Sequence, residues 1–300
     1  MTQPESPGLL ARLSSELAGV VEQVAPSVVR IEDGSRLTAT GILWTADGVI
    51  VTTSHGVERD EELAIERADG TTLPATLVGR DPDTDVAVLR VGATGLPAVQ
   101  SAPDSDVKVG HLVLALGRPG NSGLQATVGI VSARQESQTN GQPGYIVNTD
   151  AVLYPGFSGG PLVDVSGRVV GMTNRMFGRG IGVALGSPIV TAIANAILQH
   201  GRVRRGYLGV RTQLVGLPES LRSSLSLTQE RGLLIVQVEA GSPAEQGGLL
   251  LGDTLLAING SALEDVEELR RHLLAGQTVA IHLLRGGQPL DLNVTLGVGN

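Results

Sequence analysis

The chain beyond position 26 is a succession of short apolar runs, each ended within a few positions by glycine, aspartate or proline. The runs cover residues 28–31, 41–44, 49–51, 73–78, 86–91, 111–116, 126–132, 161–163, 169–172 and 181–185. Many short strands at close, regular spacing are typical of an all-β barrel or sandwich, whereas α/β folds alternate strands with helices. The chain has 41 glycines but only 2 Phe, 3 Tyr and 1 Trp. The sequence therefore predicts a mostly β fold with tight turns and an aliphatic core.

Composition limits what such a chain binds. A net charge of −8 argues against nucleic acid or an anionic membrane as the main partner, because both attract basic surfaces. With 0 cysteines, disulfides, thiolate metal sites and a cysteine nucleophile are excluded. No metal-ligand cluster is visible, and we expect no metal and no cofactor.

The sequence also gives an expectation for the compartment. No stretch reaches the 18 or so apolar residues of a membrane span. The start, Met1 to Ser6, is polar and lacks the basic and apolar regions of a secretory signal. As read, we expect a cytoplasmic protein; a trimmed N-terminus would make it extracytoplasmic.

Four segments are expected along the 300 residues. Residues 1–25 contain an apolar helical pattern, which Ser6 and Pro7 begin and Pro26 ends. Residues 26–200 form the β-rich domain, which closes with a helix over 189–200. The glycine-bounded basic stretch 201–206 is a linker. Residues 207–300 form a small α+β domain, with helical patterns over 244–249 and 263–274.

Three polar residues stand out in the β-rich domain. Taken singly, His55 is most simply a hydrogen-bonded strand end, Asp85 a turn cap, and Ser158 part of a Gly/Ser-rich turn. Together, a hydroxyl, an imidazole and a carboxylate are the groups that nucleophilic hydrolysis requires. Glycines beside Ser158 also allow backbone N–H groups to converge on one point, as an oxyanion hole needs.

The motifs around these residues resemble those of the HtrA (Deg) serine proteases. The matching segments are Val51-Thr52-Thr53-Ser54-His55-Gly56-Val57, Asp85-Val86-Ala87-Val88-Leu89, Gly117-Arg118-Pro119, Thr127 to Ser132, Asn148-Thr149-Asp150, and Gly156-Phe157-Ser158-Gly159-Gly160-Pro161-Leu162. Downstream, Gly206-Tyr207-Leu208-Gly209-Val210, Gly241 to Ala244 and Gly252 to Gly260 are similar to a PDZ domain. The resemblance spans residues 9–296 and implies a chymotrypsin-like double β-barrel followed by one PDZ domain.

Roles follow from this resemblance, residue by residue. It implies that His55 is the general base, Asp85 its orienting carboxylate and Ser158 the nucleophile. The N–H groups of Gly156 and Ser158 would form the oxyanion hole. The family usually has asparagine where this chain has Phe157, and a bulky apolar side chain there could tilt the loop or cover the site.

The resemblance also suggests a substrate pocket and a peptide groove. Val152, six positions before Ser158, would form the pocket base, with Val183 and Leu185 on the opposing segment 181–185, so a broad aliphatic preference is expected. Val183 and Leu185 could equally be core residues. In the PDZ region, Tyr207, Leu208, Gly209 and Val210 would hold a peptide carboxylate, and Leu269 and Leu273 would belong to the helix beside the groove.

Three hypotheses remain from the sequence. The first is an ATP-independent serine endopeptidase that degrades unfolded or misfolded proteins and is regulated by C-terminal peptides at its PDZ domain. The second is a proteolytically silent, chaperone-like peptide binder on the same fold. The third is an α/β-hydrolase esterase, because residues 156–160 also satisfy G-x-S-x-G, although that fold requires a different order of catalytic residues. A homo-oligomer is expected, with a trimer favoured.

Overall fold

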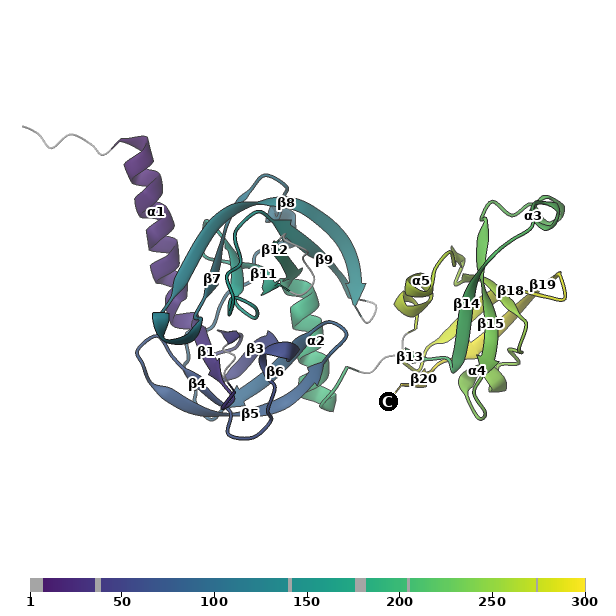
Figure 1. Cartoon of the computed structure of the whole chain (residues 1–300), viewed down its shortest axis with the longest axis horizontal. Helices are drawn as coiled ribbons and strands as arrows, with labels where there is room; N and C mark the ends of the chain where they lie inside the picture. The colour runs from purple at the N-terminus through teal and green to yellow at the C-terminus, as the bar shows by residue number, and fades with distance from the viewer. Residues whose placement is uncertain are drawn as a thin grey trace, which may run out of the picture. The chain divides into compact units, whose positions relative to one another are not determined.

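The computed structural model describes residues 8–35, 39–139, 142–175, 182–203, 206–273 and 275–299. The chain divides into two compact units, Met1–Val203 and Arg204–Asn300 (Figure 1). The division falls inside the stretch 201–206 that we propose as the linker. Each unit has hydrophobic clusters of its own.

The first unit contains two closed, antiparallel six-stranded barrels. The first barrel has the strand order β1-β2-β3-β6-β5-β4. Its strands are β1 (Val28–Glu32), β2 (Ala39–Leu43), β3 (Val49–Thr53), β4 (Ala64–Glu66), β5 (Thr72–Asp81) and β6 (Val86–Val91). Aliphatic side chains such as Val29, Ile31, Leu43, Ile50 and Leu89 fill it. An aliphatic interior is what the scarcity of aromatic residues predicts.

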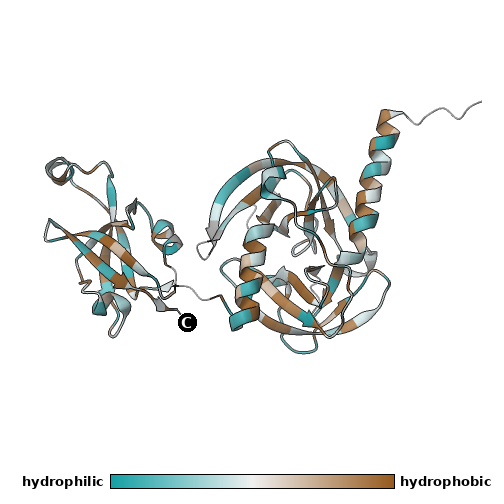
Figure 2. Ribbon diagram, turned by 180° about the vertical axis from the view of Figure 1, so that it is seen from behind, coloured by the Kyte–Doolittle hydropathy of each residue, from teal (hydrophilic) through white to brown (hydrophobic). Residues whose placement is uncertain are grey.

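The second barrel has the strand order β10-β11-β12-β9-β8-β7. Its strands are β7 (Leu112–Gly117), β8 (Gln125–Thr139), β9 (Gln142–Thr149), β10 (Pro161–Asp164), β11 (Val169–Asn174) and β12 (Gly182–Gly186). Its interior holds two of the few aromatic residues, Tyr145 and Phe157. In Figure 2 the strands of both barrels carry hydrophobic segments. The prediction of a mostly β, two-barrel domain is confirmed.

Two long helices belong to this unit. Helix α2 (Ser187–His200) contacts strands of both barrels, and its Ile189, Ile193 and Ile197 pack between them. Helix α1 (Leu9–Val24) packs Val20 and Val24 against the second barrel, while Leu9 and Leu10 stay exposed. The predicted helix start at Ser6 and Pro7 lies outside the described residues. Short 3₁₀ helices are η1 (Ala25–Ser27), η2 (Ser54–Gly56), η3 (Asp104–Asp106) and η4 (Gly120–Ser122).

The second unit is an antiparallel sheet in the order β14-β15-β16-β18-β19, with β17 paired to β16 and a separate β13-β20 pair. Its strands are β13 (Gly206–Tyr207), β14 (Val210–Gly216), β15 (Arg231–Val238), β16 (Thr254–Ile258), β17 (Ser261–Ala262), β18 (Thr278–Arg285), β19 (Gln288–Thr295) and β20 (Gly297–Val298). Its helices are α3 (Glu219–Leu225), α4 (Pro243–Gln246) and α5 (Val266–Arg271). The predicted strands are present, and α3 was not predicted.

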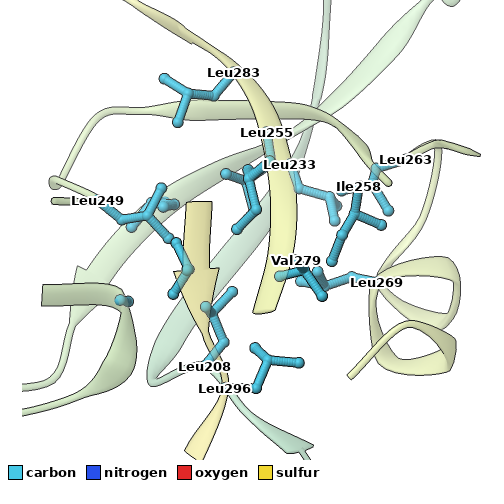
Figure 3. Close-up of a cluster of buried hydrophobic side chains, with 14 residues drawn as sticks. Leu208, Leu233, Leu249, Leu255, Ile258, Leu263, Leu269, Val279, Leu283 and Leu296 are labelled. Atoms are coloured by element: carbon cyan, nitrogen blue, oxygen red, sulfur yellow. The ribbon is translucent and has the colours of Figure 1, made fainter. Parts of the chain in front are cut away.

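The larger aliphatic cluster of the second unit lies between the sheet and helices α4 and α5 (Figure 3). A smaller cluster contains Leu217, Leu256 and Leu284. Leu208 and Leu269, both expected near a peptide groove, have their side chains in the larger cluster. Helix α5 is shorter than the predicted 263–274, because the Asp265 side chain accepts the Glu268 N–H and caps a helix that begins at Val266. The expected small α+β domain is confirmed.

Candidate active site

His55 and Asp85 are brought together by the pairing of β3 with β6. In that ladder Thr53 lies opposite Val86, so the chain just after the end of β3 is next to the residue before the start of β6. The Ser54 N–H donates to the Asp85 carbonyl (3.1 Å), and the His55 N–H donates to Asp85 Oδ1 (2.8 Å). His55 Nδ1 lies 2.5 Å from Asp85 Oδ2. Backbone and side-chain contacts therefore fix the imidazole on the carboxylate.

The Asp85 carboxylate is buried, with 7% of the residue exposed. Burial acts to raise the pKa of Asp85, but hydrogen bonds from the His55 ring and N–H, the His55 charge and the Asn174 amide together hold that pKa below its ordinary value. Asp85 has φ +55, a left-handed conformation that aspartate tolerates. The carboxylate therefore stays ionised beside the imidazole.

Sequence reasoning missed Asn174, the last residue of β11. Its Nδ2 donates to Asp85 Oδ2 (2.8 Å), and its side chain is fully buried. The only local signal is a polar residue that ends an apolar strand. The contact joins residues 89 positions apart and results from the arrangement of the two barrels.

Ser158 reaches the same place from the loop between β9 and β10. The Arg175 N–H, one residue after Asn174, donates to Ser158 Oγ (3.3 Å). The end of β11 therefore contacts Asp85 through residue 174 and Ser158 through residue 175, which brings the three residues predicted from the sequence to one location. Within the part of the chain that the structure describes, no hydrogen bond joins Ser158 Oγ to the His55 ring.

Between residues 156 and 160, two backbone N–H groups have no hydrogen-bond partner among the described residues, and they belong to Gly156 and Ser158. The intervening Phe157 N–H donates to the Tyr154 carbonyl (3.0 Å). The next two N–H groups, of Gly159 and Gly160, donate to the carbonyls of Thr173 and Phe157 (both 2.9 Å). Gly156 has φ +88, which favours glycine. The two uncommitted donors are those that the sequence predicted for an oxyanion hole.

Phe157 does not cover the site. Its side chain is fully buried in the core of the second barrel and lies edge-on to Tyr154, with 5.7 Å between ring centroids. The ring packs on Gly117, where an added Cβ would come within 2.6 Å of it. Phe157 therefore anchors the loop from inside the barrel.

The residues suggested for a substrate pocket differ in their exposure to solvent. Val152 is 56% exposed, whereas Val183 and Leu185 are buried. Leu185 packs among Met172 and Ile189 in the cluster between the barrels, which is the core role that the sequence left open for it. Residues 176–181 lie outside the described residues, so a pocket assignment stays a prediction for Val152 and Val183.

In the second unit, Tyr207 ends β13 and Val210 begins β14, which is an edge strand of its sheet. The N–H groups of Leu208 and Gly209, between those strands, have no hydrogen-bond partner within the described ranges. Gly209 has φ +84, and an added Cβ would lie 2.2 Å from Ser242 Cβ. Leu273 packs beside Leu269 at the edge of the core cluster. This loop resembles an anion-binding backbone next to an open strand edge.

The double β-barrel fold and the arrangement of His55, Asp85 and Ser158 define the class of trypsin-like serine peptidases. Family models agree: one for the trypsin-like peptidase domain matches residues 39–172, and one for the PDZ domain matches residues 206–296.

Comparison with individual proteins narrows the class of trypsin-like serine peptidases to one family. The chain is 36% identical over 266 residues to a probable periplasmic serine endoprotease DegP-like of Pseudomonas putida (strain W619), covering 86% of this chain and 55% of that protein. It is also 36% identical over 271 residues to a protein of the same name from Rhizobium meliloti (strain 1021), and the match covers 87% of this chain and 53% of that protein. The chain spans about half the length of the curated relatives it matches.

Solved structures match over nearly the full chain. The HtrA-type protease AlgW with tripeptide has a TM-score of 0.77 and 31% identity, with 94% of this chain and 97% of that chain covered. A serine endoprotease from Yersinia pestis has a TM-score of 0.76 and 28% identity, with 99% and 100% covered. The chain belongs to the HtrA family of serine endopeptidases.

The relatives correct one expectation from the sequence. Curated relatives are named periplasmic endoproteases, which points to an extracytoplasmic location, so the expectation of a cytoplasmic protein is wrong. Composition and the first residues carry too little information about compartment to decide it.

No helix among the described residues is long and apolar enough to cross a bilayer.

Proposed function

We propose that this chain is an active serine endopeptidase in which Ser158 is the nucleophile, His55 the general base and Asp85 the orienting carboxylate. The proposal rests on one observation: residues 174 and 175 contact Asp85 and Ser158, while Asp85 contacts both the backbone and the ring of His55. The three groups that hydrolysis needs are therefore neighbours, although they come from loops of both barrels.

The chemistry proceeds through an acyl-enzyme. Ser158 Oγ attacks the peptide carbonyl carbon and passes its proton to His55 Nε2, and the N–H groups of Gly156 and Ser158 bind the resulting oxyanion. The C–N bond then breaks, with the proton returning from His55 to the leaving amine. Water repeats the sequence on the ester and restores Ser158. Ionised Asp85 accepts a hydrogen bond from Nδ1–H, so that Nε2 faces the hydroxyl.

We assign unfolded or misfolded proteins as substrates, because an extended chain can enter a site on a barrel surface. Hydrolysis by these groups requires no ATP.

With Val152 and Val183 near the pocket, cleavage falls after Val, Ala, Leu or Ile. Cleavage sites in an unfolded protein, mapped by mass spectrometry, check this, and a preference for Lys or Arg contradicts it.

Regulation is assigned to the PDZ domain. The unpaired N–H groups at Leu208 and Gly209 bind a terminal carboxylate, and the edge of β14 extends the sheet with the peptide strand. In support, structures of the HtrA-type protease AlgW contain a decapeptide or a tripeptide, so a relative of this chain binds peptides. We also propose a homo-oligomer, with a trimer favoured, which light scattering of the purified protein tests.

The decisive experiment compares wild type with Ser158→Ala. Removing the nucleophile lowers turnover by on the order of 10⁶. Casein cleavage measures activity, and a fluorophosphonate probe measures the nucleophile itself. Labelling of wild type but not of the variant supports the proposal, whereas casein cleavage retained by Ser158→Ala contradicts it.

One observation favours the second hypothesis, a silent peptide binder. Ser158 Oγ is bonded to the Arg175 N–H and makes no hydrogen bond to His55 among the described residues. Catalytic hydrogen bonds are often loose without substrate, so the geometry does not exclude activity. A wild-type protein that binds unfolded chains but resists the fluorophosphonate would establish this alternative.

The esterase hypothesis is excluded, because the fold is two β-barrels.

A further inference from the structure

Two buried threonines, one from each barrel, contact the carbonyls of the loop that carries Ser158. Thr40 lies on β2 and Thr173 on β11, and both side chains are fully buried. We propose that Thr40 and Thr173 are positioning residues that orient the oxyanion-hole N–H groups of Gly156 and Ser158. This inference rests on the proposed function.

Thr173 controls the peptide that contains the Ser158 N–H. Its Oγ1 donates to the Phe157 carbonyl (2.7 Å). It also lies 3.0 Å from the Gly160 carbonyl, which already accepts the Thr173 N–H at 2.8 Å. A peptide is planar and trans, so its C=O and N–H point in opposite directions. Holding the Phe157 carbonyl on Thr173 therefore directs the Ser158 N–H away from Thr173.

Thr40 controls the neighbouring peptide. Its Oγ1 donates to the Gly156 carbonyl (2.6 Å) and accepts the Arg118 N–H (2.9 Å), while its own N–H donates to the Ser158 carbonyl (3.2 Å). Glycine at φ +88 has wide backbone freedom. The Gly156 carbonyl belongs to the same peptide as the Phe157 N–H, so Thr40 fixes the peptide that follows Gly156. With that peptide held, the Gly156 N–H can turn only by rotation about the two backbone bonds of Gly156 itself.

Apart from the backbone hydrogen bonds of the Phe157, Gly159 and Gly160 N–H groups, the loop is held by packing. Phe157 anchors it with an apolar ring, which cannot hydrogen-bond a carbonyl and so cannot replace the threonines. The next two residues leave no space for a side chain: a Cβ at Gly159 would lie 2.1 Å from the Thr40 carbonyl, and one at Gly160 would lie 2.1 Å from the Leu116 carbonyl. Packing thus fixes where the loop lies, and the two hydroxyls fix which way its first peptides face.

Valine replaces threonine with nearly the same shape and no hydroxyl. Because loss of an oxyanion donor itself lowers turnover by about 10²–10³-fold, we expect Thr173→Val and Thr40→Val each to lower kcat by about 10-fold to 100-fold, with KM little changed. Thr173→Ser and Thr40→Ser retain the hydroxyl and should recover most of the activity. Thr191→Val is the matched control, since it is the same exchange at a threonine whose Oγ1 donates to the Ser187 carbonyl within helix α2 (2.8 Å) and not to the Ser158 loop.

The test measures kcat, KM and the affinity of a peptide aldehyde, which forms a tetrahedral oxyanion on the serine, at a temperature where every variant is folded. We expect aldehyde affinity to fall in parallel with kcat in both valine variants and to change less than twofold in Thr191→Val. Should a valine variant fail to fold, the alanine variant removes the same hydroxyl without placing a methyl group against a carbonyl.

The outcomes separate this inference from the proposed function. Wild type that is labelled and active, with valine and alanine variants equal to it in kcat and aldehyde affinity, overturns the positioning role alone. Loss of activity that serine does not restore also overturns it, because the hydroxyl would then not be the cause. Wild type that the fluorophosphonate does not label overturns both proposals.

Discussion

The two halves of the candidate active site are held in different ways. The His55–Asp85 half is fixed by direct side-chain contacts: the carboxylate binds the ring, the His55 N–H and the Asn174 amide. The Ser158 half is fixed through the backbone, by threonines that contact its carbonyls and a phenylalanine inside the barrel. The first half is organised before substrate arrives, whereas the second, within the described residues, lacks a serine–histidine hydrogen bond. Regulation of such a site should act on the second half.

Asp85→Asn disrupts the His55–Asp85 half and should have a larger effect on turnover than any change to the Ser158 half short of removing Ser158. An amide in place of the carboxylate favours the wrong imidazole tautomer, and we expect kcat to fall by about 10⁴-fold. Asp33→Asn is the control, because Asp33 is a similarly buried carboxylate next to the first barrel that accepts N–H groups from Ser35, Glu58 and Arg59. It should lose stability but not turnover. Equal activity of wild type and Asp85→Asn would contradict the role of Asp85.

Peptides that bind the PDZ domain test the Ser158 half of the site. A peptide with a free, apolar C-terminus should bind residues 206–300, and its amide should bind about 10-fold to 100-fold more weakly, because the N–H groups of Leu208 and Gly209 lose a charged acceptor. In the full chain the free acid should raise kcat by shifting the Ser158 loop toward its competent arrangement.

Titration calorimetry with both peptides, followed by cleavage of a fluorogenic substrate, checks the two parts. Equal affinity of acid and amide would exclude the carboxylate loop. Tight binding of the acid with an unchanged rate would leave the PDZ domain as a tether for substrates.

The smallest expected effect is on stability against pH. The folded-state pKa of Asp85 lies below the ordinary value of 3.8, so its bonds stabilise the fold above that value and are lost as pH falls through the lower, folded pKa. The difference in unfolding free energy between wild type and Asp85→Asn should therefore shrink as the pH falls below 3.8. Urea unfolding of both proteins across this range measures it, and a constant difference would show that the carboxylate is not stabilised by its partners.

Local sequence motifs predicted most of this architecture. The spacing of short apolar runs indicated an all-β barrel or sandwich, and the segments around His55, Asp85 and Ser158 indicated the candidate site and the family, whose resemblance implied the double barrel. These signals are strong because each is carried by a few consecutive residues. The helix α3 was missed, since Glu219–Leu225 is short and its leucines pack only in a small satellite cluster with Leu256 and Leu284.

Contacts between distant strands could not be predicted in the same way. Asn174, Thr40 and Thr173 are ordinary polar residues in their own segments, and their importance comes from which strands the barrels place beside them. The same holds for Phe157, whose direction depends on the empty space over Gly117. A single sequence shows that a residue is bulky, but the direction in which its side chain points is a property of the packed fold.

The open edge of β14 carries a hazard as well as a use. An unpaired strand edge can pair with any extended chain, including a second copy of the protein or an aggregating substrate. The register between β14 and β15 shifts between Arg211 and Thr212, where β15 has one extra residue. Such a bulge bends and twists the strand pair, and continued pairing needs a regular, flat edge. The edge is thus suited to receiving the last few residues of a chain, and poorly suited to nucleating a growing sheet.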